Sequence, residues 1–302
     1  MRSWASRGLE AARLGGDRAD LWPAGALASL AFFGWWVLLL VVAPPSPGDL
    51  AFFAVSVVTS SMFPLNVALL GVAAVSGFAT LCLLAALAEA ALVRLARPGD
   101  HTPLSGGTLT GFAVILVAAL PAAAAAGVLL LGLAGIAPSE FPAPDAVPLS
   151  LRLAAALWPQ ELLLLVAIWI GQALGGLALH RSLARRGAGA GRALVESGRL
   201  LARRPLPALG IALIGLVADA LVAVVSYALL RVLWAPIAVD LGRGQLAAPE
   251  TLLLLVGFVA IWLALLLAAG AVHVAVSAWW SLEAAGARRQ PAPAGAEPWR
   301  AV

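Results

Sequence analysis

The chain has little charge, one cysteine and no lysine. Only 11% of its 302 residues are charged, whereas 62% are hydrophobic, and the mean hydropathy is +0.99. That balance leaves too little polar surface to coat a water-soluble globule of this size. The single cysteine, Cys82, excludes an intrachain disulfide and a cysteine metal cluster. We therefore predict a membrane protein.

All 19 basic residues are arginine, and the net charge is +4. The sequence pI near 10.8 does not indicate nucleic acid as a partner, because no basic cluster is interleaved with aromatic residues that could stack on bases. An all-arginine set of basic residues fits a GC-rich coding bias. It favours a bacterial source, and hence the bacterial cytoplasmic (inner) membrane.

Six apolar segments are long enough to cross a bilayer, which takes about 20 residues of helix. Charge inside them is confined to Glu89, Asp219 and the segment ends. They predict an all-α fold, a polytopic bundle of six transmembrane helices in three hairpins, with tilt or extension beyond the bilayer. The predicted spans are Ala24–Val42, Pro64–Val93, Leu109–Ile136, Glu161–Leu179, Leu206–Leu230 and Leu252–Trp280. The predicted outer loops are Ala43–Phe63, Ala137–Gln160 and Arg231–Thr251, and five prolines disfavour helix in the first half of the middle loop.

The chain divides into residues 1–22, a cytoplasmic amphipathic segment, 23–286, the membrane domain, and 287–302, a cytoplasmic tail. The Pro, Ala and Arg content of the tail predicts disorder. Acidic residues in 1–22 make a cleaved signal peptide unexpected. The apolar stretch 50–63 is too short to span, so we expect an interfacial helix there, with a re-entrant segment as the alternative.

The arginines set the orientation. With both termini inside, 16 arginines are cytoplasmic and three are outside, and positive charge gathers on the cytoplasmic side of membrane proteins. We therefore predict a multi-pass protein with both termini in the cytoplasm.

Residues 190–205 predict an amphipathic helix in the inner interface. Helical spacing places Leu194 and Leu201 on one flank and arginines on another, near anionic lipid headgroups. A solvated basic loop is the alternative. The residues predicted to contact lipid or a partner protein are Arg192, Arg199, Arg203 and Arg204.

Motifs in and beside this segment carry a family resemblance. They are Ala193-Leu194 with the run Arg203-Arg204-Pro205, the basic amphipathic opening before the first span, and the ending Ala278-Trp-Trp-Ser-Leu282. With them the chain resembles the six-helix membrane domain that is fused to bacterial glycerophosphoryl diester phosphodiesterases and that also occurs in stand-alone uncharacterised membrane proteins. Gly198 stands where that family commonly has tryptophan, and these residues hold no phosphodiesterase barrel. The resemblance implies a six-helix fold and a scaffold-like or regulatory role, not a reaction.

Asp219 is the sharpest candidate among the intramembrane polar residues. It lies thirteen residues into the fifth span, about 20 Å from the inner end and so near the midplane. An ionisable group in hydrocarbon is costly unless it is paired or hydrated. Asp219 is therefore either a proton or cation site, or a partner contact, or a hydrogen-bonded group that holds helices together.

Three further polar residues lie in the spans. His273 is about 9 Å from the inner edge, so direct pairing with Asp219 requires strong tilt or a bridging water. Glu89, five residues before Arg94, is expected to reach toward the inner interface in a structural role. Gln172 lies within Gly171-Gln-Ala-Leu-Gly175, a Gly-x-x-x-Gly motif that permits close helix contact.

The sequence carries no motif for catalysis, a cofactor or a metal. His101 and His180 lie in or beside basic inner loops without a ligand partner at metal spacing, and neither a Ser/His/Asp order nor His-Glu-x-x-His is present. We expect a protein that is not an enzyme.

Two hypotheses follow. The favoured one is a non-enzymatic membrane subunit or scaffold whose arginine-rich face contacts lipid, a protein partner or a second copy. The alternative is a permease that moves a small or lipid-like substrate past Asp219, Gln172 and His273. The two differ in whether Asp219 faces a cavity or a packed helix interface.

The orientation is tested by fusing a periplasm-active reporter after Arg97 or after Asp145. We expect a signal only from the fusion after Asp145, because the arginine bias places Arg97 inside. Signals in the reverse order would contradict the topology.

Overall fold

The computed structural model describes residues 4–44, 56–57, 59–95, 104–140, 147, 149–184, 189–244 and 248–286. The regular structure in those ranges is helical, and they contain no strand. Six helical stretches there are long and apolar enough to cross a membrane, as the sequence predicted. They are Ala19–Val42, Leu65–Leu95, Gly106–Ile136, Leu151–Leu183, Pro205–Gly242 and Pro249–Ala285.

The first span is made of three pieces, and each later span is a single helix. The three pieces are α2 (Trp22–Ser29), the π-helical turn η2 (Leu30–Gly34) and α3 (Trp35–Val42). The later spans are α5 (Leu65–Leu95), α6 (Leu104–Glu140), α7 (Leu149–Ala184), α9 (Pro205–Gly242) and α10 (Pro249–Gly286). Two shorter helices, α1 (Trp4–Asp17) and α8 (Ala190–Arg203), precede the first and fifth spans, and the short 3₁₀ turn η1 (Ala19–Leu21) leads into α2.

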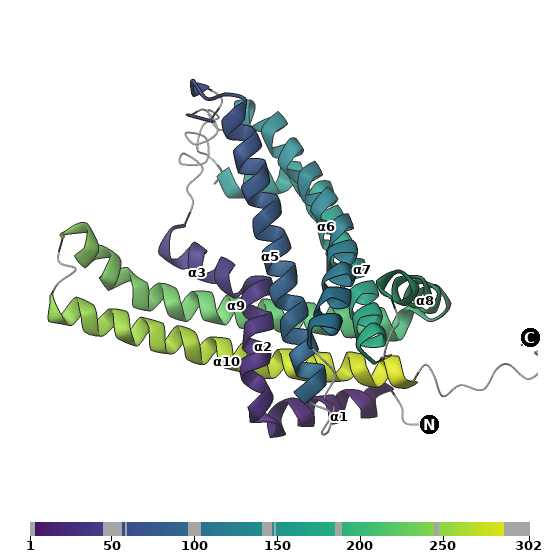
Figure 1. Ribbon diagram of the computed structural model, residues 1–302. Coiled ribbons are helices and arrows are strands. Elements are labelled where there is room, and N and C mark those ends of the chain that lie inside the picture. Colours follow the sequence, from purple (N-terminus) through teal and green to yellow (C-terminus); the bar gives the residue numbers. More distant parts are fainter. Residues whose placement is uncertain are drawn as a thin grey trace, which may run out of the picture.

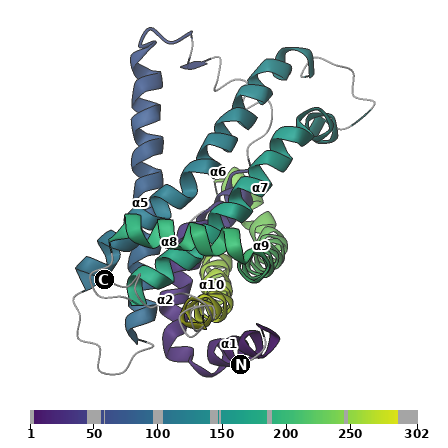
Figure 2. The same cartoon turned by 90° about the vertical axis from the view of Figure 1, so that its right-hand side faces the viewer.

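The spans form two diverging groups (Figure 1). In one group, the α9–α10 arm, α3 packs against α9 and α9 packs against α10. In the other, the α5–α7 arm, α6 packs against both α5 and α7. The arms meet where α1, α2, α8 and the C-terminal half of α10 gather, and α5 also separates from α6 away from that junction (Figures 1 and 2). The first two spans therefore touch mainly through α2 and η2 with α5, because α3 belongs to the opposite arm.

Two of the predicted outer loops are largely helical, which corrects the sequence analysis. Residues 149–160 of the middle loop belong to α7, and α9 continues to Gly242. Pro159 and Pro236 lie inside these helices without ending them. A proline removes one backbone hydrogen bond, whereas unwinding a helix in an apolar environment exposes several unpaired backbone groups, so the continuous helix is favoured. Residues 60–63 form a bend and turns, but half of 50–63 (50–55 and 58) and all of 287–302 lie outside the described residues, and their assignments stay predictions.

Each arm has its own apolar core, and further clusters lie at the junction. The cluster in the α9–α10 arm is Val37, Val41, Leu230, Ile237 and Phe258. A second cluster joins α6, α7 and α8 through Val114, Ala178, Leu179 and Ala193. At the junction, one cluster joins α7, α9 and α10, and a small one joins η1, α5 and α10.

Glycines let helix backbones touch at the junction. A Cβ at Gly25 of α2 would meet the backbone of Gly270 in α10, and a Cβ at Gly270 would meet the backbone of Trp22 and Ala26. A Cβ at Gly15 of α1 would lie 2.7 Å from the Cβ of Ala275, also in α10. These contacts bring α1 and α2 against the same half of α10, as small residues do between membrane helices.

Helix α1 lies on α10 as an amphipathic helix. The rings of Trp4 and Trp279 are 4.8 Å apart, and Arg7 forms an ion pair of 2.7 Å with Glu283. The indole of Trp22 donates a hydrogen bond of 2.8 Å to the carbonyl of Gly15, which closes the turn into the first span. Residues 4–22 of the predicted amphipathic segment are therefore part of the packed fold.

The close contact between α2 and α10 predicts the effect of adding one methyl group. Gly270→Ala forces backbone atoms apart and should lower the free energy of unfolding by about 1–3 kcal/mol or more. The measurement is thermal unfolding in detergent, followed by tryptophan fluorescence. Gly257→Ala in the same helix is the matched control, because a Cβ there meets nothing within 4 Å and alanine favours helix. Equal melting temperatures for the two variants would contradict the close packing.

Candidate functional site: a polar cavity where six spans meet

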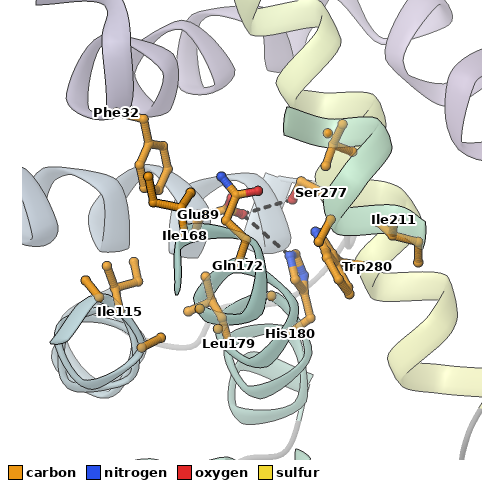
Figure 3. A pocket seen from close by; sticks show the side chains of 18 of the residues that line it. Phe32, Glu89, Ile115, Ile168, Gln172, Leu179, His180, Ile211, Ser277 and Trp280 are labelled. Carbon is orange, nitrogen blue, oxygen red and sulfur yellow. Dashed lines mark hydrogen bonds and ion pairs between the residues drawn. The ribbon is translucent and has the colours of Figure 1, made fainter. Parts of the chain in front are cut away.

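Glu89 of α5 lies buried among polar groups from two other spans. Its side chain is 6% exposed. Its Oε1 is 2.7 Å from Nε2 of His273, and its Oε2 accepts a hydrogen bond of 2.9 Å from the Ser277 hydroxyl, both on α10. Oε2 also lies 3.9 Å from Nε2 of His180 on α7. Figure 3 shows Glu89 between Ser277 and His180. The carboxylate thus joins the two arms.

The polar contacts continue along α10 toward its C-terminal end. The Ser281 hydroxyl is 3.0 Å from Nδ1 of His180. His273, Ser277 and Ser281 are spaced four residues apart, so they share one face of α10. Together with Glu89 and His180 they form a row of groups that can accept and donate protons.

One prediction about these residues was wrong. Glu89 does not reach toward the inner interface; it bonds His273 and Ser277 in the interior. His180 was not singled out by the sequence as a site residue, but it is 3% exposed and its Nδ1 contacts the Ser281 hydroxyl. The four-residue spacing in the last span was the available sequence signal for Ser277 and Ser281. No local pattern pairs His180 with Glu89, because they are 91 residues apart and meet only through helix packing.

A cavity of about 250 Å³ adjoins this polar row. Every one of the six spans contributes to its lining. The polar lining residues are Glu89, Gln172, His180, Asp219, His273 and Ser277. The volume approaches that of small-molecule sites, which typically begin at about 300 Å³ and combine apolar walls with a few polar groups.

Asp219 and Gln172 line the cavity without side-chain hydrogen bonds to the residues that the structure describes. Asp219 is close enough to His273 for their charges to interact, but they form no direct hydrogen bond. The four candidates that the sequence singled out in the spans, Asp219, His273, Gln172 and Glu89, therefore meet at one site.

Small residues shape the wall beside Gln172. A Cβ at Gly171 would lie 2.6 Å from the carbonyl oxygen of Ala118, and a Cβ at Gly175 would lie 3.0 Å from the Ala118 Cβ. The Gly-x-x-x-Gly motif therefore brings α7 close to α6, as predicted. A Cβ at Gly176 would lie 2.5 Å from the Trp280 ring, which also lines the cavity.

The arginines singled out for lipid or partner contact lie elsewhere, on or just after α8. Ala193 and Ser197 of α8 are buried, and Leu194 and Leu201 are partly buried. Arg192 is exposed and pairs with Glu196 at 2.9 Å. Arg199, Arg203 and Arg204 are exposed and form no ion pair with the described residues. The predicted amphipathic helix is confirmed, and Figure 2 shows α8 lying across the ends of the spans.

Among the described residues, no group of three or more His, Cys, Asp or Glu side chains is placed to hold a metal ion. The direct contacts of Glu89 with His273 and Ser277 are hydrogen bonds, so these side chains can share and transfer protons.

Comparisons with protein-family models, with curated proteins and with solved structures find no match for this chain. The resemblance to the membrane domain of glycerophosphoryl diester phosphodiesterases stays a prediction.

The partners of Glu89 predict how its replacement changes stability. Glu89→Leu leaves His273 and Ser277 without their acceptor and should lower the free energy of unfolding by about 3–5 kcal/mol. Glu89→Gln keeps an acceptor oxygen and should cost less. Glu250→Leu, the same substitution at an exposed position of α10, is the control and should change little. Chemical unfolding in detergent measures all three, and equal effects of Leu and Gln at position 89 would contradict a hydrogen-bonded carboxylate.

Proposed function

We propose that the protein is a permease that binds a small ligand in the cavity and carries it across the membrane, with protons moving along the polar row of Glu89, His180 and the α10 side chains. The observation that carries the proposal is the cavity itself, which is lined by all six spans and by Asp219. The scaffold hypothesis requires Asp219 in a packed helix interface, whereas Asp219 faces open space. The cavity therefore favours the permease.

The free-energy cost of burying polar residues in the membrane supports a functional role for them. Each ionisable group in the interior of a membrane protein costs several kcal/mol unless it is paired or hydrated, and such groups typically mark substrate or proton paths. Glu89 is paired, but the side chains of Asp219 and Gln172 have no hydrogen-bond partner among the described residues. A structural role leaves their presence beside the cavity unexplained, whereas a ligand or water in the cavity satisfies both.

The arrangement of the arms suits alternating access. Transporters commonly rock one group of helices against another around a site near the membrane midplane. Here the two arms have separate apolar cores and join at the cavity. The contacts between the arms are concentrated at this junction, in one apolar cluster of α7, α9 and α10 and in the hydrogen-bonded carboxylate of Glu89, so a change in angle between the arms would have to occur there.

The arginine-rich side completes the proposal. The exposed arginines of α8 and the amphipathic character of α1 support contact of this side with anionic headgroups. We assign this side to the cytoplasm, with both termini inside, and the protein to the bacterial inner membrane. Contact with a protein partner through the same arginines is compatible with transport.

The proposal is tested by the reactivity of a single cysteine in the cavity. In a Cys82→Ala background, Ala122→Cys places a thiol in the lining, whereas Ala125→Cys, one turn away, is buried in packing. A thiolate forms in water and not in hydrocarbon, so a charged, membrane-impermeant methanethiosulfonate reports a hydrated cavity.

We expect Ala122→Cys to react both in spheroplasts and in inside-out vesicles, and Ala125→Cys to react in neither. Reaction from both sides is the signature of alternating access. A cavity that reacts from neither side, or from one side only, would overturn the permease.

A further inference from the structure

Two polar side chains of the cavity have no hydrogen-bond partner among the described residues. Both carboxylate oxygens of Glu89 are occupied, by His273 and by Ser277. Asp219 has no such partner among the described residues, and the amide of Gln172 is also unpaired there. Asp219 is near enough to His273 for their charges to interact, but its carboxylate oxygens are not occupied by hydrogen bonds, so they are available to a ligand.

The rest of the wall is apolar and partly aromatic. Phe32 and Trp280 line the cavity from opposite ends of the chain, together with Ile115, Ile168 and Ile211 (Figure 3). Aromatic rings attract cations through their faces, most strongly where water is excluded. The wall can therefore hold an apolar body and a positive charge together.

Three classes of ligand fit less well. The negative charge of Asp219 would repel an anion. A neutral apolar molecule would leave that carboxylate unpaired in a medium of low dielectric. A bare divalent metal would require three or more converging ligands, and no such group of His, Cys, Asp or Glu is present among the described residues. A monovalent organic cation satisfies both the carboxylate and the apolar wall.

We propose that the cavity binds an organic ammonium ion with an apolar body, whose charge pairs with Asp219 while its body packs against Phe32 and Trp280. The inference rests on the proposed function and names the class of substrate. Gln172 supplies a carbonyl acceptor for an ammonium that carries N–H groups, whereas a quaternary ammonium is held by charge and by the rings.

Phe32 indicates the entry route. It belongs to the π-helical turn of the first span and is 47% exposed, although it lines the cavity. Its ring is 6.0 Å from that of His273, so the exposed rim lies next to the polar row. A π-helical turn re-aims side chains within a helix and is frequent at functional sites. The ligand can therefore enter sideways from the lipid, as a free amphiphilic amine or as the amine of a lipid headgroup.

The test is direct binding of radiolabelled phenyltrimethylammonium to the full chain in phosphatidylglycerol nanodiscs, with empty nanodiscs as the blank. tert-Butylbenzene has the same shape without the charge, and benzenesulfonate has a similar size with the opposite charge. We expect displacement by unlabelled cation and not by benzenesulfonate, and weaker displacement by tert-butylbenzene.

Asp219→Asn keeps the shape of the side chain and removes its charge. It should weaken cation binding by at least about 30-fold while tert-butylbenzene binding, followed with its own label, is unchanged. The unchanged neutral probe shows that the variant is folded. Asp240→Asn is the matched control, because Asp240 lies in the same helix, bonds Thr251 outside the cavity and should leave the affinity unaltered.

Equal binding of the cation and its neutral isostere, or no effect of Asp219→Asn, would overturn the proposal. If the Ala122→Cys thiol is reached from both sides but the cation does not bind, the permease stands and the ligand class is wrong. A second set of nanodiscs containing phosphatidylethanolamine assigns the source. If phosphatidylethanolamine competes with the labelled cation, the ligand is a headgroup amine. If it does not compete, the ligand is a free amine. Both outcomes support the proposal that the cavity binds an organic cation.

Discussion

Glu89 can lie in the apolar interior only because His273 and Ser277 bind it. A carboxylate without partners in hydrocarbon is too costly to keep, so this contact requires α5 and α10 to meet at one point. That point is where the two arms join. The glycines of α1, α2 and α10 bring the backbones close enough for the side chains to reach one another, and the cavity lies beside the same contact. The polar row and the cavity thus lie at one buried carboxylate, at the point where the arms join.

Beyond the junction the spans bury few of their apolar side chains against one another. The first half of α5 is exposed on nearly every side, and the outward faces of the other spans carry many exposed leucines and valines. Lipid tails are as apolar as these side chains, so a span in a bilayer gains little from covering them. The arms can therefore diverge in the membrane, whereas a soluble protein with such surfaces would aggregate.

The position of the polar groups is what changes the functional interpretation. A scaffold and a permease have the same composition, span count and arginine distribution. They differ in whether an intramembrane carboxylate is fully hydrogen-bonded to other side chains. Glu89 is hydrogen-bonded in this way, whereas Asp219 has no hydrogen bond to the described residues. The protein therefore combines a carboxylate that holds the arms together with one that lines the cavity without a hydrogen bond to the described residues.

The sequence alone was sufficient for the class of protein, the number of spans and the amphipathic helix at 190–203. Each depends on local composition: a run of about 20 apolar residues has no stable place outside a membrane, and arginines at helical spacing define a face. It also singled out Asp219, His273, Gln172 and Glu89, because polar residues are conspicuous in apolar runs. Their meeting could not be predicted, since helix depth along one axis does not tell which faces of six helices turn toward each other. The contact of His180 with Glu89, the helices that extend through Pro159 and Pro236, and the open side of Asp219 were decided by packing between distant segments. Such packing depends on which small residues let backbones touch, as Gly25 and Gly270 do, and that is a property of pairs of helices, not of either helix alone.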